Sequence, residues 1–84
     1  MTKPRHFPAV EPGEYVVGFA QQTTGHILRT DLRLALPDDI DRYVVHKSRQ
    51  DAEQFCQEMV RLHPEIECFV MDDTGMEVCV ISNV

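Results

Sequence analysis

The sequence predicts a single small α+β domain with the element order β-β-β-α-β-β, in which one helix packs on one face of a mainly antiparallel sheet. Three observations support this prediction. Residues 26–36 alternate apolar and polar side chains, as a half-buried strand does. Residues 49–63 instead repeat apolar side chains at helical spacing. The last two apolar runs of the chain are separated by Asp73, Thr74 and Gly75, which is typical of a hairpin.

The chain of 84 residues is long enough for one domain and too short for two. Residues 1–13 contain three of the five prolines. Because proline has no backbone N–H, we expect this part to be an extended N-terminal segment outside the sheet. Phe7 and Val10 could still dock it against the body. Residues 14–84 are expected to form the domain itself.

Five strands are expected, over residues 14–21, 26–36, 42–47, 66–72 and 76–82. The second is the clearest. Its alternation predicts one buried face, formed by Leu28, Thr30, Leu32, Leu34 and Leu36. The sequence leaves open whether the third and fourth strands run parallel.

The helix is the best-supported element. Ser48 stands at the N-cap position, with Asp51 three residues later as a weaker form of the capping box. Pro64 disfavours helical geometry at His63 and ends the helix. The residues expected on its apolar arc are Ala52, Phe55, Cys56, Met59, Val60, Leu62 and His63.

The final hairpin carries the main functional hypothesis. Gly75 favours a type I turn with one bulge, which would place four apolar side chains on a face that a single helix cannot cover. These candidate interface residues are Phe69, Met71, Cys79 and Ile81. An apolar patch of this kind is typical of a surface that binds a partner. The alternatives are that the N-terminal segment or a curved first strand covers it.

The three cysteines are expected to be free thiols. With one bulge, Cys68 and Cys79 point to opposite faces and cannot form a disulfide; with a plain two-residue turn they would lie opposite each other. An odd number of cysteines favours a reducing compartment, so a cytoplasmic location is expected. Neither a C-x-x-C motif nor an H-E-x-x-H motif is present, and we expect no cofactor and no metal.

The net charge of −6 disfavours nucleic acid as a partner, and no apolar run is long enough to cross a membrane. We therefore expect a small acidic protein–protein interaction or regulatory module that acts by contact. Its partner would be a basic protein that meets an acidic face, or a second copy in a homodimer. The alternative is a small-ligand-binding or catalytic subunit with a site between helix and sheet, near Cys56 and His63. No signature of an enzyme is present.

Overall fold

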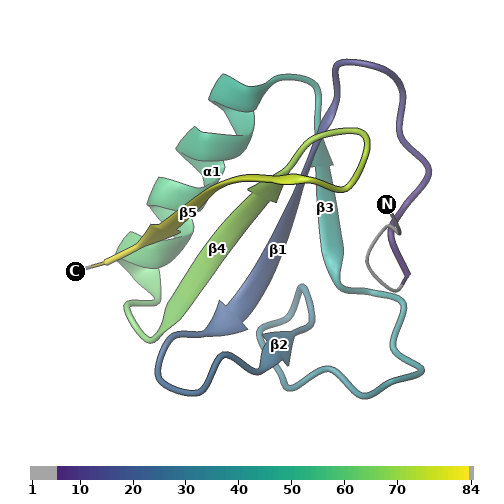
Figure 1. The fold of residues 1–84 in the computed structure, drawn as a ribbon. Helices are drawn as coiled ribbons and strands as arrows, with labels where there is room; N and C mark the ends of the chain where they lie inside the picture. Colours follow the sequence, from purple (N-terminus) through teal and green to yellow (C-terminus); the bar gives the residue numbers. More distant parts are fainter. Residues whose placement is uncertain (1–5, 84) are drawn as a thin grey trace.

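The six elements form in the expected order in the computed structural model, which describes residues 6–83. They are β1 (Tyr15–Gln21), β2 (Ile27–Leu28), β3 (Tyr43–His46), α1 (Arg49–Leu62), β4 (Ile66–Met71) and β5 (Glu77–Ser82). The strands pair antiparallel throughout the sheet, and α1 covers one of its faces (Figure 1). The predicted α+β fold and its element order are confirmed.

β1 is the central strand of the sheet. One edge of β1 pairs with β4 along six residues. The other edge is shared end to end, since β3 pairs with residues 15–18 and β2 with Phe19 and Ala20. β5 pairs with the far side of β4. β3 and β4 therefore run in the same direction on opposite sides of β1, without pairing with each other.

α1 begins and ends where the sequence signals predict. Ser48 is the N-cap in an extended conformation, and its Oγ accepts a hydrogen bond from the N–H of Asp51 at 3.1 Å. At the other end, the N–H of His63 donates to the carbonyl of Met59 at 2.8 Å. Pro64 follows, and the helix stops because proline disfavours helical geometry in the preceding residue.

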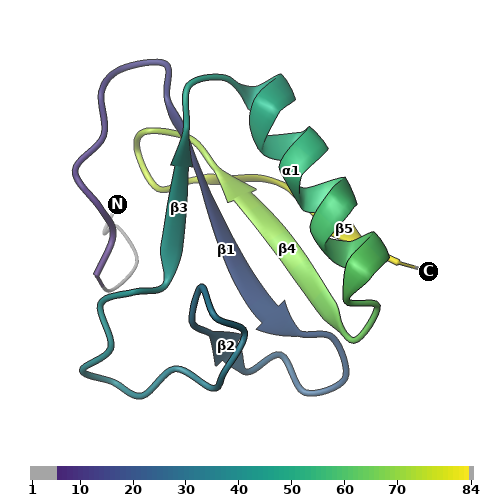
Figure 2. The ribbon, with the colours of Figure 1, turned by 180° about the vertical axis from the view of Figure 1, so that it is seen from behind.

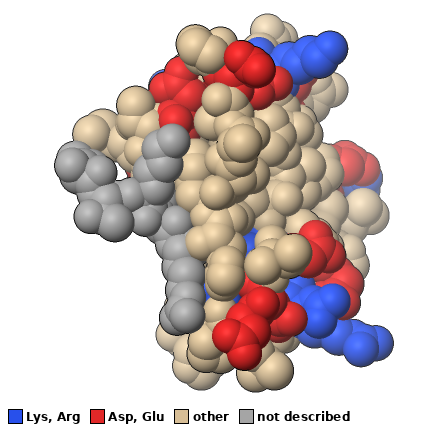
Figure 3. All heavy atoms as spheres, turned by 90° about the vertical axis from the view of Figure 1, so that its right-hand side faces the viewer, with Lys and Arg blue, Asp and Glu red and all other residues tan. Residues whose placement is uncertain are grey.

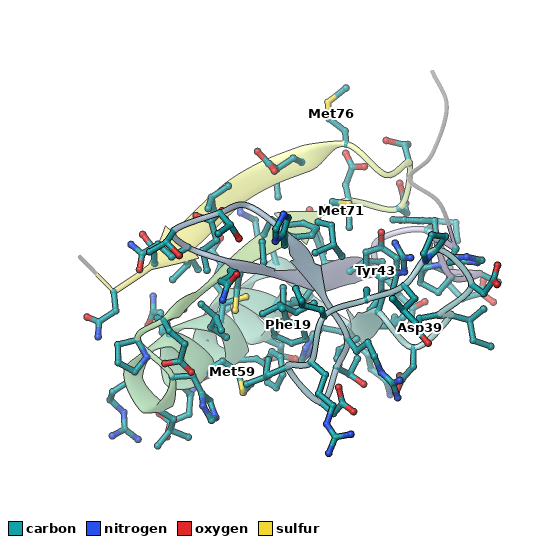
Figure 4. The ribbon with its side chains drawn as sticks, turned by 90° about the horizontal axis from the view of Figure 1, so that it is seen from below. Phe19, Asp39, Tyr43, Met59, Met71 and Met76 are labelled. Carbon is teal, nitrogen blue, oxygen red and sulfur yellow. The ribbon has the colours of Figure 1, made fainter. Side chains whose placement is uncertain are left out.

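The main core lies between α1 and the sheet. Figure 2 shows α1 running alongside β4 and in front of β5, and Figure 4 shows Phe19 on the side of the sheet that faces α1 and Met59 beside the helix. Removing these apolar side chains from water is the main favourable contribution to folding. The buried members of this core are Val17, Phe19, Leu28, Ala52, Cys56, Val60, Ile66, Cys68 and Val70.

Two residues expected on the apolar arc of the helix, Leu62 and His63, lie outside the core. Leu62 is 56% exposed, whereas Val60 is 5% exposed. At 3.6 residues per turn, a residue two positions beyond Val60 lies about 200° around the helix axis. The prediction that Leu62 belongs to the buried arc is therefore wrong.

The strand predicted over residues 26–36 is wrong beyond its first residues. β2 ends at Leu28. The backbone then turns: Leu32 adopts a left-handed φ of 68°, and its N–H donates to the carbonyl of Arg29 at 2.9 Å. Leu34 returns to form a bridge with Leu28. Because the turn interrupts the alternation, the leucines of this run do not share one buried face.

The final hairpin contains the expected left-handed glycine, with φ of 87°, but also a second irregularity. Val70 faces Cys79, whereas the next residue, Met71, faces Glu77. Val78 is therefore an extra residue on β5, which is the definition of a bulge. The sequence predicted only one bulge, at the turn.

This extra residue overturns the predicted faces of the hairpin. Cys68 lies opposite Ile81, and residues directly opposite each other point to the same side of a sheet. Cys79 and Ile81 therefore face α1, whereas Phe69 and Met71 face away from it. Cys68 and Cys79 share the helix side, and the prediction that they point to opposite faces is wrong. Both thiols are nevertheless free.

The sheet face opposite α1 is partly covered by the chain itself. Gly18 lies between Tyr43 on β3 and Phe69 on β4, and the Phe69 ring lies over the glycine. Val16 and Met71 are almost fully buried. The turn between β4 and β5 crosses in front of β1 in Figure 1, and Figure 4 shows Met71 on the side away from α1.

Residues 6–13 contain no helix or strand and run beside β3 (Figure 1). The ring of Phe7 lies 6.0 Å from that of Tyr43, so Phe7 packs against β3. The N–H of Gly13 donates to Oδ2 of Asp73 at 2.9 Å, which fixes the end of the segment to the β4–β5 turn. The first five residues of the predicted extended segment lie outside the described residues.

Candidate binding groove

An open groove of about 490 Å³ lies in the segment that connects β2 with β3. Its volume is in the range of small-ligand and side-chain pockets. It is lined mainly by apolar side chains, with one histidine and one arginine: His26, Ile27, Leu34, Ala35, Leu36, Pro37 and Arg42. The chain leaves the sheet edge at β2 and returns to the same edge at β3, so these residues gather beside β1 (Figure 1).

Arg42 holds one wall of the groove in place. Its side chain is only 9% exposed, and its Nε donates to the carbonyl of Asp39 at 2.7 Å. Its Nη2 donates to the carbonyl of Leu36 at 2.5 Å. The Asp39 carboxylate in turn accepts a hydrogen bond from the N–H of Leu36 at 2.8 Å. Hydrogen bonds to charged groups are among the stronger ones, so this loop has a defined shape.

Residues 29–33, which connect β2 to the lining residue Leu34, form a tight turn. The carboxylate of Asp31 accepts a hydrogen bond from the N–H of Arg33 at 3.1 Å and lies 3.4 Å from Nε of Arg29. Nη1 of Arg29 also lies 3.5 Å from Oδ1 of Asp39, so an ion pair joins this turn to the loop of residues 36–42. The apolar lining therefore rests on a polar scaffold.

Large apolar side chains are exposed at the groove. Leu34 is 57% exposed and Leu36 is 66% exposed, and Ile40, in the adjoining loop, is 75% exposed. Sequence reasoning missed this surface because the alternation assigned both leucines to a buried face. No local signal marks the end of the strand at Leu28, because the alternation continues to Leu36.

Acidic side chains flank the apolar surface. Asp38 and Asp41 are exposed, and neither makes an ion pair within residues 6–83. Figure 3 shows one face of the molecule, on which an uncharged area lies between an upper and a lower group of acidic side chains, and basic side chains stand beside the lower group. Residues 26–42 carry four aspartates and three arginines, and the two exposed side chains among them that lack an ion pair in the described residues are both acidic.

The four predicted interface residues do not form one surface. Phe69 and Met71 lie on the face opposite α1, where Met71 is 3% exposed. Cys79 and Ile81 are half-buried on the helix side and pack against the main core. Whether any of them contacts a partner stays a prediction.

Cys56 and His63, the pair named for an alternative site, are not brought together. Cys56 is fully buried, and a hydrogen bond with Cys68 together with burial raises the pKa of its thiol. A thiol held in its protonated form is a poor nucleophile. His63 is half-exposed at the end of α1, where its Nδ1 lies 3.6 Å from Glu65. The structure describes no contact between the two side chains.

Residues 6–83 hold neither a metal site nor a membrane-spanning helix. Among residues 6–83, no group of three or more His, Cys, Asp or Glu side chains is placed to bind a metal ion. No helix in the same range combines the length and the apolar character needed to cross a bilayer. A second hollow, of about 410 Å³, lies on α1 and is lined by Gln50, Glu53, Gln54 and Gln57. Its polar side chains are those of a solvated helix face.

Comparison of the chain with protein-family models, with curated proteins and with solved structures finds no match.

Proposed function

We propose that this protein is a small interaction module that acts by contact, and that its groove receives an apolar side chain from a basic segment of a partner protein. The observation that carries the proposal is the exposure of Leu34 and Leu36 on a groove whose wall is fixed by the buried Arg42. An exposed apolar patch with a polar rim is typical of a protein-binding surface. A wall of defined shape also reduces the entropy lost on binding.

Charge favours a basic partner. The chain has a net charge of −6, and Asp38 and Asp41 stand beside the groove without an ion pair in the described part of the chain. Opposite charge on a partner accelerates encounter and restricts the choice of partner, whereas the apolar contact supplies most of the affinity. The proposed function is therefore the one that the sequence predicts, an acidic module that acts by contact, but its proposed site is residues 26–42 and not the last hairpin.

Selection of displayed random peptides on the immobilised protein tests the proposal directly. We expect the selected peptides to carry a large apolar residue next to Lys or Arg. In a titration followed by NMR, such a peptide should shift the amide resonances of residues 26–42 first. Its affinity should fall when the salt concentration rises from about 50 to about 300 mM, because salt screens the surface charges.

A matched pair of variants separates the groove from apolar surface in general. Leu36→Ser should weaken peptide binding about tenfold, which corresponds to about 1.4 kcal/mol. Leu62→Ser removes a leucine of similar exposure on α1 and should leave binding unchanged. Selected peptides that are acidic, or that bind both variants equally, would contradict the proposal.

A further inference from the structure

The longest edge strand of the described sheet is β5. The opposite edge is divided between the two residues of β2 and the four residues of β3. β5 has six residues and, in the described part of the chain, pairs with β4 alone. The outer N–H and C=O groups of an edge strand are a template for pairing with another strand.

Most of β5 lacks the features by which proteins protect such edges. Charged residues, prolines and bulges usually do so. In β5 these are confined to its start, where Glu77 precedes the bulge at Val78. Residues 79–82 carry neither a charge nor a proline. The edge is therefore open along its second half.

We propose that β5 pairs with β5 of a second copy, antiparallel, about a two-fold axis at Val80. In this register Cys79 lies opposite Ile81 of the second copy, and Glu77, beyond the bulge at Val78, lies at the end of the paired strands toward Asn83, an amide that can donate to a carboxylate. A two-fold axis at Cys79 would instead bring Glu77 toward the apolar Ile81. The charges of the two strands lie at the far ends in the proposed register, so they do not repel.

The side chains on β5 fit this pairing. Val80 is 49% exposed on the face away from α1, and it would meet its own copy at the axis. Cys79 and Ile81 are half-buried beside α1, and the second strand would cover the part of their surface that is still exposed. A pairing this short buries little surface. Interfaces below about 1,200 Å² are typical of weak association, so the dimer should form with rising concentration.

This dimer leaves the grooves free. The groove adjoins β2, and β5 lies at the other end of the strand order. A dimer joined through β5 would present two grooves at its outer ends. Two linked sites can bind a partner that has two target segments more tightly than one site can.

Sedimentation equilibrium over a range of protein concentrations tests the pairing. We expect the apparent mass of the parent to rise from 9.7 kDa toward twice that value. Val80→Lys should stay monomeric, because two ammonium groups would meet at the axis. Val45→Lys is the matched control on β3, where the valine is 38% exposed, and it should still dimerise. Circular dichroism melts check that both variants are folded.

A disulfide trap tests the register without disturbing the fold. In a Cys79→Ser background, Val80→Cys should form a linked dimer with oxidised glutathione, since the two residues face each other at the axis. Val45→Cys in the same background should not. A parent that stays at 9.7 kDa at every concentration, or a dimer that survives Val80→Lys, would overturn the proposal. Leu36→Ser should not change the dimer, so failure of the groove and failure of the pairing can be told apart.

Discussion

The ring of Phe69 occupies the place of a side chain on Gly18. A Cβ atom built on Gly18 would lie 2.3 Å from Cε2 of Phe69 and 2.4 Å from its Cζ, which is closer than non-bonded atoms can approach. The ring would have to move to admit a methyl group. We therefore expect Gly18→Ala to lower the free energy of unfolding by about 1–3 kcal/mol in urea titrations, as overpacking does.

A double variant tests this contact. Phe69→Ala removes the ring and leaves space above residue 18, so the alanine at position 18 should cost much less in that background. The costs of the two single changes should then sum to more than the cost of the double change. Strictly additive costs would show that the ring and the glycine do not meet.

Stability should decline in mild acid because of His46. Its ring lies 4.8 Å from that of Phe55, and its Nε2 is buried without a hydrogen-bond partner in residues 6–83. Burial lowers the pKa of His46 from its ordinary value of 6.5, and the nearby Asp51 offsets part of this effect. Below pH 6.5 the unfolded chain takes up a proton before the folded chain does, so the free energy of unfolding should fall.

Urea titrations between about pH 5 and about pH 8 measure how the free energy of unfolding changes with pH. This interval lies above the range in which carboxylates ordinarily titrate. His46→Gln should flatten the curve below pH 6.5. His26→Gln removes an exposed imidazole, and the free energy of unfolding of this variant should still fall in mild acid. Equal slopes in the parent and in His46→Gln would remove His46 as the cause.

The three thiols should react in a fixed order with an alkylating reagent. Cys79 is half-buried, whereas Cys56 and Cys68 have no exposed surface. Burial raises the pKa of Cys79, although Arg49 opposes part of that rise. Mass spectrometry of the native protein should therefore find slow alkylation, first at Cys79, and three rapid additions in denaturant. Fewer than three additions in denaturant without a reductant would reveal a disulfide.

Two residues near the end of α1 should differ sharply in how much stability is lost when each is replaced by alanine. Val60→Ala removes buried carbon and should cost about 1.5–2.5 kcal/mol, at about 0.8 kcal/mol for each buried methylene and with a further cost for the cavity. Leu62→Ala should change the stability by less than about 0.5 kcal/mol, as exposed substitutions usually do. Thermal melts that rank Leu62 above Val60 would contradict the orientation of the helix.

The sequence predicts the elements whose signals are local. Ser48 and Pro64 mark the ends of α1, and each acts through its own backbone geometry. The order of the six elements follows from hydrophobic spacing and turn residues alone. These features depend on neighbours in the chain, so they could be found without coordinates.

The wrong predictions concern segments whose structure is determined by tertiary contacts and not by the local sequence. The bulge at Val78 shifts the register by one residue, and a shift of one residue exchanges the two faces of a strand. In residues 26–36, the left-handed Leu32 and the hydrogen bonds of Asp31 and Arg42 outweigh an alternating pattern. The groove was missed for that reason.

The shared edge of β1 makes the segment between β2 and β3 exchangeable. The chain leaves this edge after Leu28 and returns to it at Tyr43, so the intervening residues do not pass through the sheet or under α1. Apart from Leu32, which packs against the main core, their length and composition can change while the strand register stays as it is. The protein therefore has the plan of a scaffold with an exchangeable loop, in which new sequences could be grafted between two fixed anchor points.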